Sequence, residues 1–177
     1  MLVGITLKWP AKFNLGGNVM KSFYVNPVGE IRVRGGEMLI ELGKKYIPAL
    51  KELNSFSHVN VLWWFDGFDT EEARSHLERP QPYKNAPDII GVFATRSPVR
   101  PNPIALTTVQ IFDIDFEEGV IQIAYIDADD RSPVLDLKPY TPSLDRVEQP
   151  QVPEWCKHWP KSIEESAVFD WGKEFNF

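Results

Sequence analysis

The chain has 177 residues, of which 43% are hydrophobic and 25% charged, and its formal net charge is -6. This length and composition predict one globular domain of the ordinary soluble kind, with a sizeable core. The acidic charge argues against holding nucleic acid by bulk electrostatics, because neutralising phosphates takes a basic face. Any RNA contact is therefore expected from local clusters such as Arg32 with Arg34 or Arg96 with Arg100.

The sequence also carries information about the compartment. No apolar run approaches the roughly 20 residues that span a bilayer, and residues 1–9 lack the basic start and cleavage site of a secretory signal. The single cysteine, Cys156, cannot form an internal disulfide, which is typical of a reducing compartment. We therefore expect a cytoplasmic protein with no membrane association.

A regular pattern of apolar and polar residues becomes clear only after residue 25. Residues 1–25 are interpreted as an N-terminal extension. Alternation of apolar and polar residues over 28–33 predicts a half-buried strand, and 38–42 predicts a second. Apolar residues recur at helical spacing over 43–53, which predicts a short amphipathic helix with Pro48 near its first turn.

The middle of the chain alternates between strands and turns. The aromatic and β-branched run 56–65 predicts a central strand. Thr70 suits the N-cap of a short helix that ends by residue 77, and 89–93 predicts another strand. Two further strands, 104–113 and 120–126, are expected to form a hairpin.

The stretch from Gly91 to Ala105 runs from an apolar segment into a proline-rich loop. Three prolines there each fix a φ angle and remove a backbone donor, so the loop can be neither a helix nor a central strand. Arg96 and Arg100 are thereby held on a scaffold that loses little entropy when a ligand arrives. Asn102 offers an amide that both donates and accepts. A surface turn with solvated arginines is the alternative.

Residues 91–104, Gly-Val-Phe-Ala-Thr-Arg-Ser-Pro-Val-Arg-Pro-Asn-Pro-Ile, resemble the signature of the TsaA/TrmO-like family. Its members include S-adenosylmethionine-dependent methyltransferases that act on a modified adenosine beside the tRNA anticodon. Residues 133–140, Pro-Val-Leu-Asp-Leu-Lys-Pro-Tyr, resemble a second signature of the family. The resemblance extends over roughly residues 26–146.

The succession of short strands predicts a mainly β fold, a twisted antiparallel barrel of about eight strands with one or two short flanking helices. The barrel domain is expected over 26–146. Residues 147–177 form a loop-rich tail whose tryptophans need cover, from the barrel or from a second subunit. A homodimer is the corresponding prediction.

The family resemblance implies a cofactor site for S-adenosylmethionine in the signature loop, the strand after it and an acidic turn. Carried onto this sequence, the cofactor-binding residues are Phe65, Asp66, Arg96, Leu106, Asp127, Asp130, Arg131 and Ser132. Asp127 and Asp130 are the carboxylates expected to face the sulfonium.

Two segments depart from the family pattern. Many relatives carry a longer loop that ends in Pro-Arg-Gln and contributes to the cofactor site, whereas Arg34-Gly35-Gly36-Glu37 follows the first strand here. Arg34 and the glycine amides are the candidates to substitute for that loop. Relatives also place a histidine and a basic residue after the central strand, where this chain has Asp66 and Gly67.

Methyl transfer to a nucleobase nitrogen is an in-line displacement in which the acceptor must also lose a proton. The resemblance makes Arg100 and Asn102 candidates for acceptor binding. Asp136, Lys138 and Tyr140 are candidates for catalysis, with Asp136 or Tyr140 as the base. A structural ion pair between Asp136 and Lys138 is an equal alternative.

Other chemistries lack support in the sequence. There is no phosphate loop, nucleophile elbow, dinucleotide fingerprint or zinc-ligand spacing, and no metal is expected. His58 is more often a structural residue than a base at such a position. The predicted function is methylation of N6 of threonylcarbamoyladenosine in tRNA. The alternatives are the same barrel methylating a small molecule or another nucleotide, and a non-enzymatic barrel that binds RNA or a nucleotide.

Overall fold

The computed structural model describes residues 14–15, 18–19 and 23–176, so most of the predicted N-terminal extension, 1–25, lies outside the described residues. The contacts divide the chain into two compact units. The barrel unit comprises the described residues up to Trp64 together with Leu106–Tyr140. The loop unit comprises Phe65–Ala105 and the described residues from Thr141 onward.

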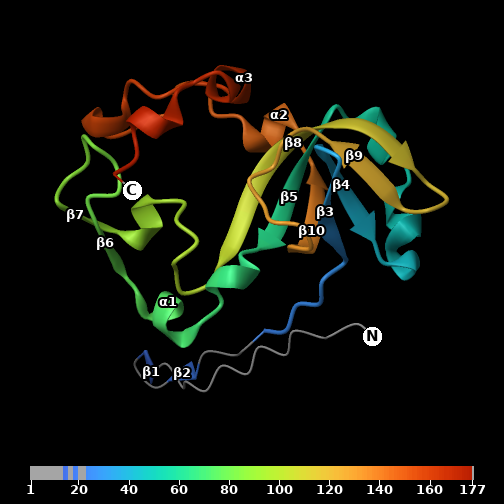
Figure 1. Ribbon diagram of the computed structural model, residues 1–177, viewed down its shortest axis with the longest axis horizontal. Helices are drawn as coiled ribbons and strands as arrows, with labels where there is room; N and C mark the ends of the chain where they lie inside the picture. Colours follow the sequence, from blue (N-terminus) through green and yellow to red (C-terminus); the bar gives the residue numbers. More distant parts are fainter. Residues whose placement is uncertain (1–13, 16–17, 20–22, 177) are drawn as a thin grey trace. The chain divides into compact units, whose positions relative to one another are not determined.

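Among the described residues, six strands close a barrel in the order β10-β3-β4-β9-β8-β5 (Figure 1). Their bounds are β3 Gly29–Arg34, β4 Glu37–Leu42, β5 His58–Trp64, β8 Ile104–Asp115, β9 Val120–Ile123 and β10 Pro133–Pro139. The predicted antiparallel barrel is confirmed, but it closes with fewer strands than the about eight expected. One reason is that the strand predicted at 89–93 pairs outside the barrel.

Two hairpins of the barrel depend on glycines at their turns. In the β3–β4 hairpin, Arg34 pairs with Glu37 across Gly35 and Gly36, whose φ angles are 60° and 90°. Both φ values lie in the left-handed region that glycine adopts at no steric cost, which suits a two-residue turn. The predicted hairpin of β8 and β9 is also confirmed, with Gly119 at φ 73° in its turn.

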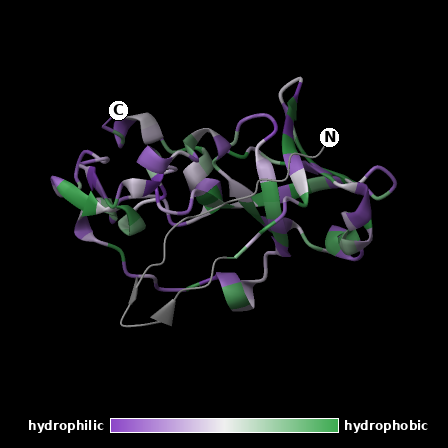
Figure 2. Cartoon of the chain, turned by 90° about the horizontal axis from the view of Figure 1, so that it is seen from below, coloured by the Kyte–Doolittle hydropathy of each residue, from purple (hydrophilic) through white to green (hydrophobic). Residues whose placement is uncertain are grey.

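The barrel interior is filled by branched aliphatic side chains from alternate strand positions. Figure 2 shows hydrophobic and hydrophilic residues following one another along the ribbons. The side chains with no exposed surface include Ile31, Ile40, Val59, Val61, Ile121 and Val134. Full burial of each stabilises the fold by about 1.5–3 kcal/mol, so these strands are held chiefly by their inward faces.

The amphipathic helix predicted over 43–53 forms as a tighter and shorter element. It is the 3-10 helix η1, Lys44–Leu50, followed by the short 3-10 helix η2, Leu53–Ser55. Pro48 lies inside η1, and its missing backbone donor is a reason that an α-helix does not form here. Leu50 is nonetheless 2% exposed, as the apolar spacing predicts.

The loop unit begins with 3-10 helix η3, Asp66–Phe68, and helix α1, Glu71–Ser75. Thr70 caps α1 as predicted, because its Oγ1 accepts the backbone N–H of Ala73 at 3.1 Å. Strand β6, Glu78–Pro80, pairs with β7, Ile89–Gly91, in a separate sheet. The strand predicted at 89–93 therefore ends at Gly91, and the chain continues as 3-10 helix η4, Val92–Ala94.

The C-terminal residues form four short helical elements: α2 Pro142–Asp145, η5 Glu154–Cys156, α3 Ile163–Ala167 and η6 Trp171–Lys173. Within the loop unit, the end of the chain lies beside the segment that carries β6 and β7 (Figure 1). Tyr83 forms an antiparallel bridge with Phe175, and the backbone N–H of Lys84 donates to the carbonyl of Glu174 at 2.9 Å. No helix in the part of the chain that the structure describes is long and apolar enough to cross a membrane.

Candidate functional site

The signature loop, residues 91–105, is closed by hydrogen bonds from its own side chains. Val92 is 1% exposed and anchors η4. The buried Thr95 hydroxyl donates to the Val92 carbonyl at 2.8 Å and accepts the backbone N–H of Ser97 at 3.2 Å. Two residues further on, the Ser97 hydroxyl accepts the N–H of Val99 at 3.3 Å. These consecutive turns fix the backbone conformation at Arg96.

Arg100 is part of the loop's own scaffold. Its Nη1 donates to the carbonyl oxygens of Thr95 and Ser97, at 3.3 Å and 3.4 Å. The side chains of Arg96 and Asn102 are exposed, and the Asn102 carbonyl accepts the N–H of Ile104 at 2.7 Å. Because a guanidinium has five donors, Arg100 keeps others for an acceptor while it holds the loop.

Arg74, on α1, holds the signature loop from outside. It is 8% exposed. Its Nε donates to the Asp69 carboxylate and its Nη1 to the Pro101 carbonyl at 2.9 Å. Sequence reasoning missed this residue, because an arginine among the charged residues of a short helix gives no signal of its burial. Only the tertiary contact identifies it.

Phe65 and Asp66 adjoin the end of the signature loop. The backbone N–H of Phe65 donates to the Pro103 carbonyl at 2.9 Å, and Pro103 is fully buried. Asp66 is exposed at the start of η3. The loop unit therefore contains five of the predicted site residues: Phe65, Asp66, Arg96, Arg100 and Asn102.

Phe93 is a second residue that sequence reasoning missed. It lies in η4, within the signature, and is 79% exposed. An exposed aromatic ring within the signature loop offers a face on which a base can stack. Its place in an apolar run predicts a buried strand residue, whereas the change from β7 to η4 leaves the ring in solvent.

The acidic turn, residues 127–132, belongs to the barrel unit, and Asp130 ties it to β3. Its Oδ1 accepts the backbone N–H of Val33 at 3.0 Å and lies 3.6 Å from Arg32 Nε. Ser132 is buried, and its carbonyl accepts the N–H of Ile31 at 2.9 Å. Arg131 is exposed and has φ 71°, a left-handed conformation in which a branched or bulky residue is strained. The Asp130 carboxylate is therefore engaged in contacts that hold the turn to β3.

Asp127 is the more available carboxylate of the turn. It is exposed, and its Oδ1 accepts the hydroxyl of Tyr125 at 3.4 Å. Partial desolvation of its hydroxyl raises the pKa of Tyr125, and the neighbouring Asp127 carboxylate adds to the rise. The hydroxyl therefore stays protonated and able to donate. Leu106, on β8 of the same unit, is 49% exposed.

The turn that replaces the expected Pro-Arg-Gln loop borders a hollow. Arg34 is held by an ion pair with Glu41, so its guanidinium is engaged across the hairpin. A hollow of about 260 Å³ lies beside the turn, lined by Gly36, Glu37, Met38, Phe112, Gln122, Ile123, Ala124 and Tyr125. Phe112 and Tyr125 are 57% and 73% exposed, so aromatic surface is available there.

The three predicted catalytic residues follow one another on and after β10. Lys138 Nζ lies 2.8 Å from Asp136 Oδ2, and the two side chains are 62% and 50% exposed. This hydrogen bond raises the pKa of Lys138, so the ammonium stays charged. The backbone N–H of Tyr140 donates to the His58 carbonyl at 3.0 Å, and the two rings meet edge to face at 6.3 Å. His58 Nδ1 lies 2.9 Å from the Ser57 hydroxyl.

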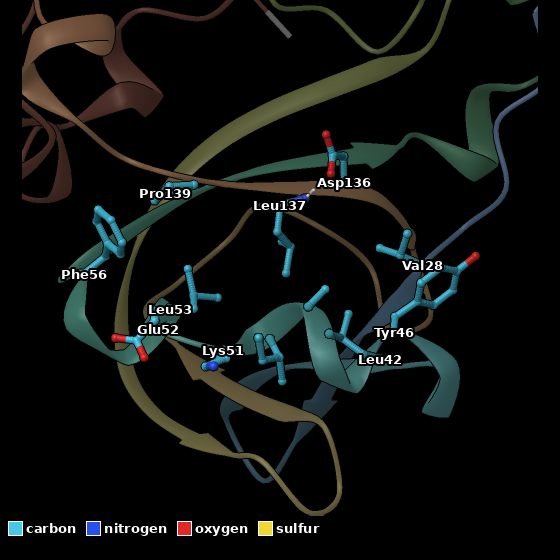
Figure 3. Close-up of a pocket in the computed structure, with 12 residues that line it drawn as sticks. Val28, Leu42, Tyr46, Lys51, Glu52, Leu53, Phe56, Asp136, Leu137 and Pro139 are labelled. Carbon is cyan, nitrogen blue, oxygen red and sulfur yellow. Dashed lines mark hydrogen bonds between the residues drawn. The ribbon is translucent and has the colours of Figure 1, made fainter.

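Asp136 also borders a cavity of about 230 Å³ between η1, η2 and β10 (Figure 3). Its other lining residues are Val28, Leu42, Tyr46, Ala49, Leu50, Lys51, Glu52, Leu53, Phe56, Leu137 and Pro139. In Figure 3 Leu137 points into the cavity, whereas the Asp136 carboxylate points away from the aliphatic side chains. The cavity is smaller than the roughly 300–1,000 Å³ of ordinary ligand pockets. We therefore assign it to packing under η1.

The described residues contain no group of three or more His, Cys, Asp or Glu side chains placed to hold a metal ion.

The closed antiparallel barrel puts the barrel unit in the class of small β-barrel domains, whose topology differs from that of doubly wound α/β folds. A family model described as the tRNA-methyltransferase O N-terminal domain matches residues 22–146, and the chain belongs to this family. The resemblance seen in the two signatures is thereby confirmed.

Among curated relatives, an S-adenosyl-L-methionine-binding protein of Archaeoglobus fulgidus is 36% identical over 110 residues, which cover 62% of this chain and 73% of the relative. The tRNA (adenine(37)-N6)-methyltransferase of Escherichia coli K12 is 31% identical over 116 residues, 64% of this chain and 48% of that enzyme. The chain thus spans about half the length of the E. coli enzyme.

Solved structures of TrmO also resemble this chain. A crystal structure of TrmO superposes with a TM-score of 0.59 at 28% identity, covering 75% of this chain and 64% of that one. A crystal structure of TrmO from Pseudomonas aeruginosa superposes with a TM-score of 0.56 at 27% identity, covering 74% and 62%. The family match ends at residue 146, before the tryptophan-rich C-terminal residues.

Proposed function

We propose that this chain is an S-adenosylmethionine-dependent methyltransferase that modifies N6 of adenosine 37 in tRNA, with threonylcarbamoyladenosine as the preferred acceptor. The observation that carries the proposal is the signature loop, whose backbone is fixed by Thr95 and Arg100 while the Arg96 side chain is exposed. Family membership and the relatives' names support the cofactor and the acceptor class.

The residues present fit a cationic cofactor. Asp127 offers an accessible carboxylate, which is the group expected beside a positive sulfonium, whereas Asp130 is bound to Arg32 and Val33. Leu106 offers half-exposed apolar surface. In the proposal the residues that hold the cofactor are Asp127, Leu106, Arg96, Phe65 and Asp66. The backbone of 130–132 shapes the turn. When bound, the cofactor supplies an electrophilic methyl group.

The remaining residues act on the acceptor in this proposal. Arg100 and Asn102 hold it, and the carboxylate and carbamoyl oxygens of a threonylcarbamoyl group are natural partners for donors of this kind. N6 must lose a proton as it becomes methylated, and Asp136 or Tyr140 accepts it. Lys138 stays protonated beside Asp136, so it orients the carboxylate and does not itself accept the proton.

The test begins with calorimetric titration of the full chain with S-adenosylmethionine and its demethylated product. Saturable binding is expected, and Arg96→Ala and Asp127→Asn should each weaken it about tenfold or more, the scale of losing a charged hydrogen bond. Arg146→Ala is the matched control, because Arg146 is an exposed arginine of the loop unit outside the signature loop. A wild-type chain that binds neither compound would overturn the proposal and favour a non-enzymatic barrel.

The same barrel acting on a small molecule or free nucleotide is the second candidate, and the net charge of -6 favours it. The two are separated by offering unmodified tRNA, threonylcarbamoylated tRNA and free nucleosides, and by titrating salt against tRNA binding. Methylation of N6 on the modified tRNA, with affinity that falls as salt rises, supports the RNA enzyme.

The homodimer remains a prediction. Sedimentation of the full chain measures the oligomeric state that tests it.

A further inference from the structure

The prolines of the signature loop limit how its end can be held. Pro101 and Pro103 have no backbone N–H, so the main chain at these positions is held through carbonyl oxygens. The Pro103 carbonyl accepts the backbone N–H of Phe65 at 2.9 Å. The Pro101 carbonyl accepts Nη1 of Arg74 at 2.9 Å. A charged side chain therefore holds the first of these two carbonyls.

Arg74 can fix that carbonyl because its own position is fixed. It lies on α1 and is 8% exposed. Its Nε donates to the Asp69 carboxylate, so the plane of the guanidinium is set by two partners at once. Within the loop unit, the yellow-green segment that follows η4 runs back to α1, where this contact is made (Figure 1). The Pro101 peptide is thus tied to a buried cation.

Pro101 separates the two residues proposed to hold the acceptor, Arg100 and Asn102. Consecutive Cα atoms are about 3.8 Å apart, and the proline ring restricts φ between them. A shift of the Pro101 carbonyl therefore moves the backbone of both neighbours together. Arg100 has further contacts with the loop, whereas the Asn102 side chain is exposed. The direction of the Asn102 amide depends most on this peptide.

The backbone at Arg96 is held by other hydrogen bonds. The Thr95 hydroxyl donates to the Val92 carbonyl at 2.8 Å and accepts the N–H of Ser97 at 3.2 Å. Neither of these two bonds involves Arg74. The support of the proposed cofactor residue Arg96 is therefore separate from the contact that holds Pro101.

We propose that Arg74 is a positioning residue of the acceptor site, which acts through the Pro101 carbonyl on Arg100 and Asn102. This inference rests on the proposed role of those two residues in holding the modified adenosine. A misplacement of about 1 Å can cost about a hundredfold in rate, so fixing this carbonyl matters for turnover as well as for stability.

The decisive variant is Arg74→Lys, which keeps a cation beside Asp69 but loses the planar fork that holds two acceptors in fixed directions. The KM for threonylcarbamoylated tRNA should rise about tenfold, the scale of losing a hydrogen bond from a charged donor. The Kd for S-adenosylmethionine should stay within about twofold of wild type, because the Thr95 hydrogen bonds remain. Arg146→Lys is the matched control, since Arg146 is an exposed arginine of the loop unit.

Asp69→Asn separates positioning from stability. It removes the ion pair and keeps the hydrogen bond from Arg74 to the Pro101 carbonyl. We expect a lower melting temperature with a KM for tRNA close to wild type, because a buried cation loses its counter-charge while the carbonyl stays held. All assays are run below the melting temperatures of the variants. A KM that followed the melting temperature in both variants would make Arg74 only a structural support and would overturn the inference.

Hydrogen exchange gives a readout that needs neither tRNA nor cofactor. The N–H of Ile104 donates to the Asn102 carbonyl at 2.7 Å, and in Arg74→Lys it should exchange about two- to tenfold faster, the scale of one weakened hydrogen bond. The N–H of Ser97, held by the Thr95 hydroxyl, should exchange at the wild-type rate. Unchanged exchange at Ile104, or equal acceleration at both amides, would overturn the inference.

A second variant covers the case in which Arg74→Lys does not fold. The double variant Arg74→Gln with Asp69→Asn contains no buried charge at this contact, and the shorter glutamine loses the guanidinium donor to Pro101. It should show the same rise in KM for tRNA and the same faster exchange at Ile104. A wild-type KM in this folded variant would overturn the inference.

The outcomes separate this inference from the proposed function. Faster exchange at Ile104 with a normal KM for tRNA would overturn the inference and leave the proposed methyltransferase intact. A wild-type chain that binds S-adenosylmethionine but methylates no tRNA would overturn the proposed acceptor, and the inference with it. In that case the exchange experiment still reports whether Arg74 orders the end of the signature loop.

Discussion

The Lys138 ammonium lies 2.8 Å from the Asp136 carboxylate. The two residues are two positions apart on β10, so their side chains lie on the same face of the strand. Exposed ion pairs of this kind contribute little to stability. Asp136→Asn should therefore leave the melting temperature almost unchanged and, if Asp136 is the base, lower kcat by about a hundredfold or more. Single-turnover methylation and thermal melting measure the two effects. A normal kcat with a lowered melting temperature would instead assign the pair to the fold, and Tyr140→Phe would then become the test for the base.

Arg74 gives a prediction about loop anchoring. Its guanidinium joins the Asp69 carboxylate to the Pro101 carbonyl and is almost completely buried. Arg74→Met should destabilise the fold by about 3 kcal/mol, because it removes the buried cation that hydrogen-bonds the Asp69 carboxylate and the Pro101 carbonyl. Urea unfolding measures this loss. Adding Asp69→Asn should recover part of it, whereas the two losses would simply add if the residues were independent.

The barrel could be predicted because its strands obey local rules. Inward residues such as Ile31 and Ile40 recur every second position, and the glycine turns at 35–36 and 119 mark the hairpins. Thr70 was likewise readable as a helix cap, since capping depends on near neighbours. Strand number was predicted less well, because barrel closure depends on how distant strands pair and not on local periodicity.

The candidate site was predicted from two signatures, yet the contacts that hold its residues were not. Nothing in the sequence shows that Asp130 is engaged by Arg32 and Val33 while Asp127 is left accessible. The sequence gives no signal of the burial of Arg74 either. Each depends on segments far apart in the chain, and charged residues look alike in a sequence whether they are solvated or paired.

Glu174 gives a prediction about pH. Its pKa is lowered in the folded chain, chiefly by the hydrogen bond from His158 and then by that from Trp159. A carboxyl with a lowered pKa stabilises the fold above its ordinary pKa of 4.5, and this contribution is lost as the pH falls through the lowered value. The packing of Trp159 against Tyr83 and Trp155 should therefore loosen below about pH 4.5. Tryptophan fluorescence between pH 3 and 7 measures it. Glu174→Gln should remove the acid transition. Glu154→Gln is the control and should leave the transition in place, because Glu154 is an exposed carboxylate that pairs with Lys157.

Phe93 gives a prediction about the acceptor. Its ring is 79% exposed two residues after the start of the signature loop, on a turn anchored by Val92. Stacking of a base on an aromatic ring contributes about 1–3 kcal/mol, so Phe93→Ala should weaken tRNA binding by about five- to a hundredfold if the ring carries a base. The affinity for S-adenosylmethionine should not change, because the Thr95 and Arg100 hydrogen bonds of the loop remain. Phe93→Trp should restore tRNA binding, and Phe23→Ala is the control, since Phe23 is 85% exposed outside the loop. Filter binding at fixed salt measures all three, and equal tRNA affinities of Phe93→Ala and wild type would exclude a stacking role for this ring.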